Sequence, residues 1–137
     1  MLLAKNCLQN REIYYGNIII PKLKINHGFF DVKDGKNNLE NGIKLLYNKN
    51  NSMIFAGYSG SHNKGIFNNL VLLKENDEII IKRKNLIDEY RISEISYAKK
   101  DGNIKISKKK NEKILILTTT CQNRKEYQLI IKAILLL

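Results

Sequence analysis

The sequence predicts a mostly β protein, a single closed β-barrel of about eight strands with one or two short helices. Short β-branched apolar runs and alternating apolar and polar stretches recur along the chain, separated by turn-forming residues. The chain has 137 residues, 43% of them hydrophobic, which is enough for one core and too few for two ordinary domains. We therefore expect one domain over residues 13–137, preceded by a flexible lead-in at residues 1–12.

The first half of the chain alternates apolar stretches with turns. Residues 13–26 form the first predicted strand, in which Pro21 marks an edge or an irregular point. The aromatic residues of 28–32 are expected to pack in the core under a loop, and residues 34–38 have turn chemistry. Apolar residues recur at helical spacing over residues 38–47, which are predicted as a short helix packed on the sheet.

Alternation continues through the second half. The remaining strands are expected at residues 53–57, 77–84, 87–97, 113–121 and 127–136. Between them the sequence predicts a Gly/Ser/Asn loop at 59–65 and a helical turn at 68–73. The period slips within residues 87–97, which indicates a bulge. The last two strands are predicted to form an antiparallel pair.

The chain is strongly basic, with a formal charge of +11. Such a charge favours anionic partners, and nucleic acid, lipid headgroups and acidic wall polymers all fit it. The cations are scattered, with the densest run at residues 108–110, and no aromatic stacking platform lies among them. We therefore expect no nucleic-acid binding, and a small basic barrel that binds polyanions ranks lowest among the functions considered.

The two cysteines lie in different contexts. Cys7 and Cys121 have no metal-ligand spacing, so we expect no metal site, no cofactor and no structural disulfide. Cys121 ends the apolar run 113–121 and is followed by a polar cluster, which places it at a strand terminus. A thiol there has a fixed direction and access to substrate, as a nucleophile requires. The alternative is a buried, inert thiol at the edge of the core.

Motifs along most of the chain resemble those of the sortases, cysteine transpeptidases of Gram-positive cell surfaces. The matching segments are GNIIIPKL at 16–23, LENGI at 39–43, AGYSG at 56–60, FNNL at 67–70, LKENDEI at 73–79 and LTTTC at 117–121. The last resembles the family's TLxTC signature, although Leu117-Thr118 stand where that motif has Thr-Leu. The resemblance implies a sortase-type barrel in which Cys121 attacks a peptide carbonyl and gives a thioacyl-enzyme.

Two positions depart from the family pattern. The family's histidine falls on Tyr58, and a phenol cannot protonate a leaving amine as an imidazole does. The family's arginine falls on Gln128, which can give an oxyanion only a neutral hydrogen bond. His62 is the histidine near Tyr58, and it is either a substitute acid or an exposed loop residue; His27 is a weaker candidate. Catalysis is therefore expected from Cys121, His62 and Gln128.

The resemblance also implies a substrate groove and its occupants. Thr120, Ser59 and Arg124 are expected to line the groove. Arg124 or Lys125 could supply the charge of the missing arginine, and the alternative is that each is a solvated loop cation. The implied partners are an LPxTG-like sorting-signal peptide and an amine acceptor from a cell-wall precursor or a pilin. No run approaches the about eighteen apolar residues of a membrane span. Membrane association at the extracellular face is therefore expected only through an N-terminal anchor that this sequence does not contain.

Two functions follow from these features. The first is a sortase-like transpeptidase impaired by the replacement of the usual histidine and arginine. The second is a catalytically inactive protein of the same fold that binds or regulates through its peptide groove.

Overall fold

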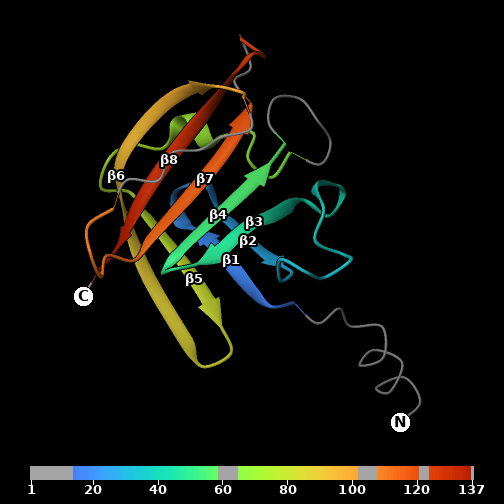
Figure 1. Ribbon diagram of the computed structural model, residues 1–137, viewed down its shortest axis with the longest axis vertical. Coiled ribbons are helices and arrows are strands. Elements are labelled where there is room, and N and C mark those ends of the chain that lie inside the picture. Colours follow the sequence, from blue (N-terminus) through green and yellow to red (C-terminus); the bar gives the residue numbers. More distant parts are fainter. Residues whose placement is uncertain (1–13, 59–64, 102–107, 121–123, 137) are drawn as a thin grey trace.

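Eight strands form one continuous sheet in the computed structural model (Figure 1). The structure describes residues 14–58, 65–101, 108–120 and 124–136. The strands are β1 Gly16–Ile20, β2 Ile25–Phe29, β3 Ile43–Lys49, β4 Ser52–Gly57, β5 Glu78–Arg83, β6 Leu86–Lys99, β7 Ile114–Thr120 and β8 Tyr127–Leu135. Their order in the sheet is β2-β1-β5-β6-β8-β7-β4-β3.

The sheet curves into a nearly closed barrel, which confirms the predicted fold class. All neighbouring strands are antiparallel except β4 and β7, which run parallel. The two edge strands, β2 and β3, form no ladder with each other. Near this gap the ring of His27 lies directly over Gly42, where a β-carbon would come within 2.8 Å of the imidazole. Gly42 has a φ of 108°, so both its backbone and its surroundings require glycine.

Two apolar clusters cover the two faces of the sheet. The larger fills the barrel and includes Phe29, Phe55, Phe67 and Tyr90 among its fully buried side chains. The smaller lies on the outer face and contains Ile54, Ile114 and Ile116, with Tyr47, Ile130 and Ile134 packed against them. Because β4, β7 and β8 carry apolar residues on both faces, the alternation of apolar and polar residues is lost in this part of the sheet.

Several local predictions are confirmed. Strand β5 buries Ile79 and Ile81 on its inner face, as its alternation predicts. The expected bulge in β6 lies between Ile92 and Glu94. Strands β7 and β8 form the predicted antiparallel pair. The helical turn near residue 70 is the 3-10 turn η3, Leu70–Leu72.

Two local predictions are wrong. Residues 38–47 form the 3-10 turn η2, Leu39–Asn41, and then strand β3, because Ile43 and Leu45 alternate into the core. Residues 13–26 are not one strand: the 3-10 turn η1, Pro21–Leu23, reverses the chain between β1 and β2. Pro21 fixes the φ of the first turn residue, and Lys24 ends the turn in a left-handed conformation. The described residues contain 3-10 turns and no α-helix.

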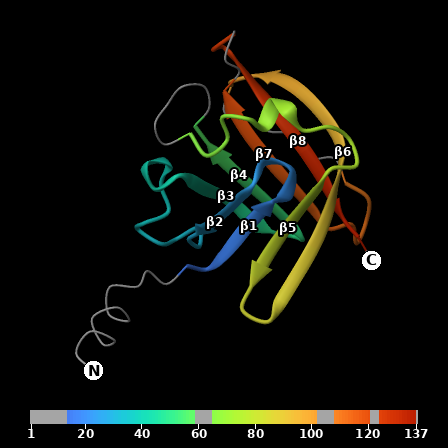
Figure 2. The ribbon, with the colours of Figure 1, turned by 180° about the vertical axis from the view of Figure 1, so that it is seen from behind.

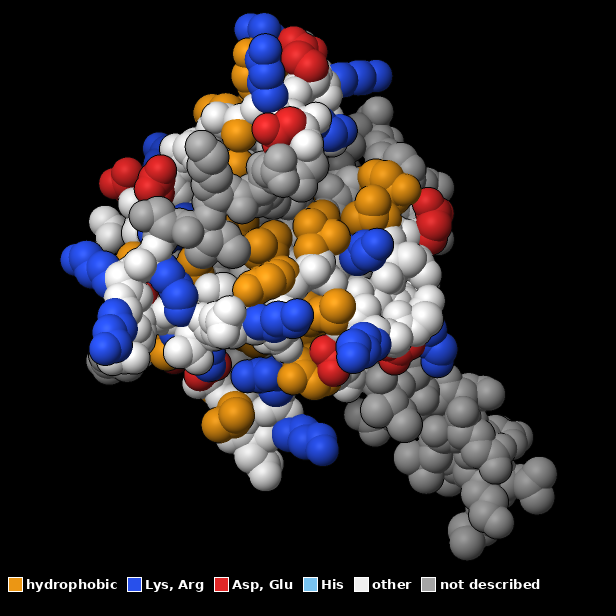
Figure 3. Space-filling view, in the orientation of Figure 1, with side chains coloured by type: hydrophobic (Ala, Val, Ile, Leu, Met, Phe, Trp, Pro, Cys, Tyr) orange, Lys and Arg blue, Asp and Glu red, His pale blue; other side chains and the backbone are white. Residues whose placement is uncertain are grey.

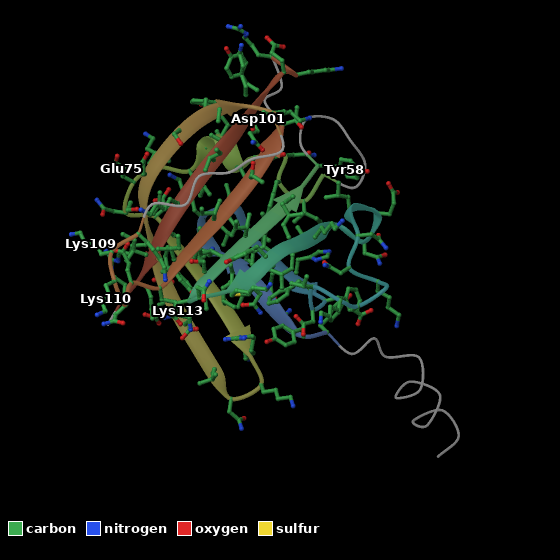
Figure 4. All side chains as sticks on the ribbon, viewed as in Figure 1. Tyr58, Glu75, Asp101, Lys109, Lys110 and Lys113 are labelled. Atoms are coloured by element: carbon green, nitrogen blue, oxygen red, sulfur yellow. The ribbon has the colours of Figure 1, made fainter. Side chains whose placement is uncertain are left out.

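The barrel has two distinct ends. Strands β4 and β7 finish at one end, towards which Tyr58 and Asp101 lie in Figure 4, whereas Lys109, Lys110 and Lys113 lie towards the other. The hairpin between β5 and β6 projects at this second end, and the view from behind shows the same arrangement (Figure 2). Along the described part of the chain, no helix has the length and apolar character needed to cross a membrane.

Candidate functional site

The parallel pair β4 and β7 brings two distant segments of the chain to one end of the barrel. Ala56 lies opposite Thr118, so the last residues of the two strands, Gly57 and Thr120, lie at the same end of the barrel. The buried hydroxyl of Thr119 donates a 2.8 Å hydrogen bond to the carbonyl oxygen of Gly57 and extends this pairing beyond the ladder. The residues following this bond are Tyr58 on one segment and Thr120 on the other, with Cys121 next in sequence.

Two of the predicted site residues that the structure describes, Thr120 and Gln128, lie on the outer face of the sheet. Thr119 points into the barrel, so its neighbour Thr120 lies on the outer face, where Gln128 of β8 is its cross-strand partner. Both side chains are half-buried, and so is that of Tyr58. The structure therefore places Thr120 and Gln128 on adjacent strands at the end where Tyr58 follows β4.

Gln128 is held in one orientation by its neighbour. The Thr118 hydroxyl donates a 2.9 Å hydrogen bond to the Gln128 Oε1. The NH₂ group of this amide has no acceptor among the described residues, so it is available as a donor. Gln128 can therefore offer a directed neutral hydrogen bond at this end of the barrel.

Tyr58 is tied to the turn before β3. Its hydroxyl donates a 3.0 Å hydrogen bond to the Glu40 Oε1 of η2. This bond, with smaller contributions from burial and the charge of Glu40, raises the pKa of Tyr58 above its ordinary value of 10.0. The phenol is neutral at neutral pH and is a poorer proton donor than an ordinary tyrosine.

Lys100 is a site residue that the sequence did not reveal. Its Nζ donates a 3.0 Å hydrogen bond to the Thr120 Oγ1, and its backbone N–H donates to the carbonyl oxygen of Glu126. The ammonium group therefore lies beside the residue that directly precedes Cys121. The sequence places Lys100 in a turn after a strand. Only the register of β6, β8 and β7 brings it across the intervening strand β8 to Thr120.

Arg124 makes its contacts within the turn that precedes β8. Its Nε lies 3.1 Å from the Glu126 Oε1, and its guanidinium stacks over the Tyr127 ring at 4.8 Å. Both partners of the ion pair are exposed, so solvent screens it strongly. These contacts lie beside the end of β8 and hold the guanidinium against its own turn.

Three predicted site residues, Cys121, His62 and Ser59, lie outside the described residues. His27 is half-buried against Gly42, and its Nδ1 lies 2.7 Å from the Gly28 carbonyl oxygen, so its ring has a packing role. Among the residues that the structure describes, no group of three or more His, Cys, Asp or Glu side chains could hold a metal ion.

The outer apolar cluster continues from these residues along the sheet. Ile130 lies opposite Thr118, and Ile116 lies opposite Ile54 further from the strand ends. All three isoleucines share the outer face with Gln128. Figure 3 shows hydrophobic side chains gathered over β4 and its neighbours on this face. Ile54 and Ile116 are buried and Ile130 is half-buried, so of these three residues Ile130 is the one that offers apolar surface beside the polar groups at the strand ends.

Comparisons with known proteins agree with this architecture. A family model described as the Sortase domain matches residues 18–136. Sortase A from Corynebacterium diphtheriae, in a lid mutant, is 22% identical, with a TM-score of 0.78 over 98% of this chain and 77% of that one. The Clostridium perfringens Sortase D5 transpeptidase is 25% identical, with a TM-score of 0.75 over 98% and 88%.

A pilus-related structure is also similar. Sortase C from Streptococcus pneumoniae is 15% identical, with a TM-score of 0.77 over 92% of this chain and 71% of that one. No curated protein matches the sequence at a significant level. Because the family model spans nearly the whole barrel, from β1 to the end of β8, the chain belongs to the sortase family.

Proposed function

We propose that this protein is a cysteine transpeptidase of cell-wall sorting signals in which Cys121 is the nucleophile and acylation is slow. The observation that carries the proposal is the parallel β4–β7 pair, fastened by the bond from Thr119 to Gly57. It supports a site in which the residue after Thr120 and the loop after Tyr58 share one end of the barrel. The thiolate would attack a peptide carbonyl carbon, the leaving amine would take a proton, and a second amine would release the acyl group.

The replaced partners account for slow acylation. The pKa of Tyr58 is raised by Glu40, so this phenol is a poor acid for the departing amine. The NH₂ group of Gln128 supplies a neutral donor to the oxyanion, which is weaker than a charged guanidinium. His62, in the loop after Tyr58, is the proposed proton donor.

Lys100 is proposed to supply the positive charge of the site. Its ammonium group donates to Thr120, one residue before the nucleophile. A cation at this position favours the thiolate over the thiol and lowers the thiol pKa, although its exposure screens the effect. Lys100 acts on the nucleophile in this proposal and need not touch the substrate.

The groove residues support an extended peptide as substrate. Thr120 and the half-buried Ile130 would form part of the floor, and Ser59 and Arg124 would lie at its edges. The amine acceptor would be a cell-wall precursor or a pilin, and the site of action the extracellular face of the membrane.

Mass spectrometry of the protein incubated with an LPxTG-type peptide tests the proposal. Wild type and Cys7→Ala should accumulate a thioacyl adduct over hours, and Cys121→Ala should form none. His62→Ala should slow the adduct further, whereas Tyr58→His should accelerate it. Stoichiometric acylation of wild type within minutes would contradict the impaired site, and an adduct that persists in Cys121→Ala would remove Cys121 as the nucleophile.

The alternative is a peptide-binding protein without catalysis. It is favoured by the neutral character of both Tyr58 and Gln128 at neutral pH. The groove floor does not depend on those two side chains, so the protein can bind a peptide without catalysing acyl transfer. Saturable binding of the peptide, equal in wild type and Cys121→Ala, without any adduct after prolonged incubation, would establish this function.

A further inference from the structure

The end of the barrel opposite the candidate site carries exposed aliphatic side chains. Leu86 and Ile87, the first residues of β6, are 60% and 62% exposed. Tyr14 lies nearby, because it lines the same depression as Leu86. A hairpin turn is usually polar, so two adjacent, largely exposed aliphatic residues on this hairpin need an explanation.

Cations surround these residues. Lys82 and Arg83 end β5, and Lys84 lies in the turn. Lys82 and Lys84 are exposed and form no ion pair among the described residues. Arg83 is held in place because its Nη1 donates a 2.9 Å hydrogen bond to the Tyr15 hydroxyl and its guanidinium lies over that ring. We call the set Tyr14, Lys82, Arg83, Lys84, Leu86 and Ile87 the basic apolar tip.

The carboxylates near the tip are partly neutralised. Asp88 is paired with Lys113 at 2.8 Å. Asp31 and Asp34 line the depression of about 510 Å³ that contains Tyr14 and Leu86, and each accepts a backbone N–H bond in its own turn. Glu89, two residues after Ile87, is exposed. Asp31 and Asp34 share their loop with the exposed Lys33 and Lys36, so this loop carries no net charge. The three cations of the tip and Lys113 then outnumber Asp88 and Glu89 by four to two.

We infer that the basic apolar tip docks on an anionic lipid bilayer. Aliphatic side chains at the centre, lysines and an arginine around them, and a tyrosine at the edge are the combination that the headgroup region accommodates. A soluble polyanion would use the cations but would leave Leu86 and Ile87 in water. A second copy of the chain would bring like charges together, which opposes self-association.

The placement of the tip gives the inference a geometric consequence. Strand β6 has 14 residues and runs from Leu86 at the tip to Lys99 beside the candidate site, roughly 40 Å if extended. A bilayer held at the tip therefore faces the end of the barrel that is furthest from Lys100 and Thr120. The substrate end would point away from the membrane. This inference does not depend on the chemistry of Cys121.

Vesicle flotation with the full chain tests the inference. Phosphatidylcholine vesicles that contain phosphatidylglycerol should bind the protein at low salt, and high salt should weaken binding because it screens the cations. Leu86→Ser/Ile87→Ser should lower the partition coefficient about tenfold, since both side chains leave water only when the tip inserts. Lys82→Gln/Lys84→Gln should lower it by about tenfold or more.

Val71→Ser/Leu72→Ser is the matched control, since these residues of η3 are 60% and 55% exposed and lie outside the tip. It should bind like wild type. Wild-type binding by Leu86→Ser/Ile87→Ser, or equal binding to neutral vesicles, would overturn the inference. Two further results would overturn it. One is complete competition by inorganic polyphosphate that is the same for wild type and Leu86→Ser/Ile87→Ser. The other is a concentration-dependent dimer that wild type forms and Leu86→Ser/Ile87→Ser does not.

Discussion

Polar side chains are hydrogen-bonded to neighbours at one end of the barrel and exposed to solvent at the other. At the candidate site each described polar side chain is held by a neighbour: Tyr58 by Glu40, Gln128 by Thr118, and Lys100 by contact with Thr120. At the basic apolar tip, Lys82 and Lys84 extend into solvent beside exposed Leu86 and Ile87. Orientation matters where a bond is to be broken, whereas a surface that binds a fluid partner gains little from fixed directions. The five predictions below test this contrast, from the largest expected effect to the smallest.

Gly57→Ala should cause the largest loss of stability. A β-carbon on Gly57 would lie 2.7 Å from the buried Phe67 ring, so the ring or strand β4 must move. We expect the free energy of unfolding to fall by about 2–3 kcal/mol, measured by urea denaturation. Gly35→Ala is the control because nothing lies within 4 Å of its β-carbon position. A loss at Gly57 no larger than at Gly35 would show that the site end is loosely packed.

Thr119→Val should weaken the contact between β4 and β7. The variant keeps the shape of the side chain but leaves the buried Gly57 carbonyl without its 2.8 Å donor. We expect a loss of about 1–2 kcal/mol in the free energy of unfolding and slower acylation of Cys121. Thr119→Ser, which retains the hydroxyl, should preserve the acylation rate better than the valine variant. Equal acylation rates in the two variants would show that this hydrogen bond does not affect acylation.

Asp77 lies between the two ends and ties η1 to the start of β5. Partial burial opposes ionisation, but the backbone N–H of Lys74 and the ammonium group of Lys22 outweigh it and hold the pKa of Asp77 below its ordinary 3.8. A lowered pKa stabilises the fold above the ordinary carboxyl pKa and loses that contribution as pH falls below it.

Asp77→Asn should therefore lower the free energy of unfolding by about 1 kcal/mol at neutral pH and by less in acid. Denaturation at several pH values measures the difference. Asp101→Asn, which changes the same residue type outside this contact, provides the comparison. A difference between wild type and Asp77→Asn that grows as pH falls would show that the sign of the coupling is wrong.

Lys100→Met should slow the alkylation of Cys121 by iodoacetamide at neutral pH by about threefold to tenfold. In the proposed site, removal of the cation beside Thr120 would leave less of the thiol as thiolate. Lys99→Met is the control, since Lys99 points to the opposite face of β6. The pH profile of alkylation should shift upwards for Lys100→Met alone, and parallel profiles for both variants would remove Lys100 from the site.

Leu86→Ser/Ile87→Ser should leave the fold unchanged. Because both residues are mostly exposed, the free energy of unfolding should stay within about 0.5 kcal/mol of wild type. Acylation at Cys121 should also be unaffected, since the tip and the site are at opposite ends. A larger loss would mean that these side chains support the barrel and would undo the contrast between the two ends.

The strand pattern was largely readable from the sequence because β7 and β5 carry strong, regular signals. Residues 38–47 misled because the same apolar residues fit a helical period and an alternating strand with a bulge between Leu45 and Tyr47. At the candidate site, the motifs indicated Tyr58, Thr120 and Gln128, which the structure places at one end of the barrel, and their catalytic roles stay predictions. Lys100 stayed hidden because a lysine in a turn has no local signal, and its proximity to Thr120 depends on the register of three strands.

The parallel contact between β4 and β7 also governs when the site can form. The Thr119–Gly57 bond joins residues 62 positions apart, so closing it follows the ordering of the long intervening segment. Strand β7 follows β1 to β6 in the sequence, so β4 leaves the ribosome well before its parallel partner does. The contact between Lys100 and Thr120 can therefore form only after β7 has been made. This end of the barrel is among the last parts of the described fold to be completed.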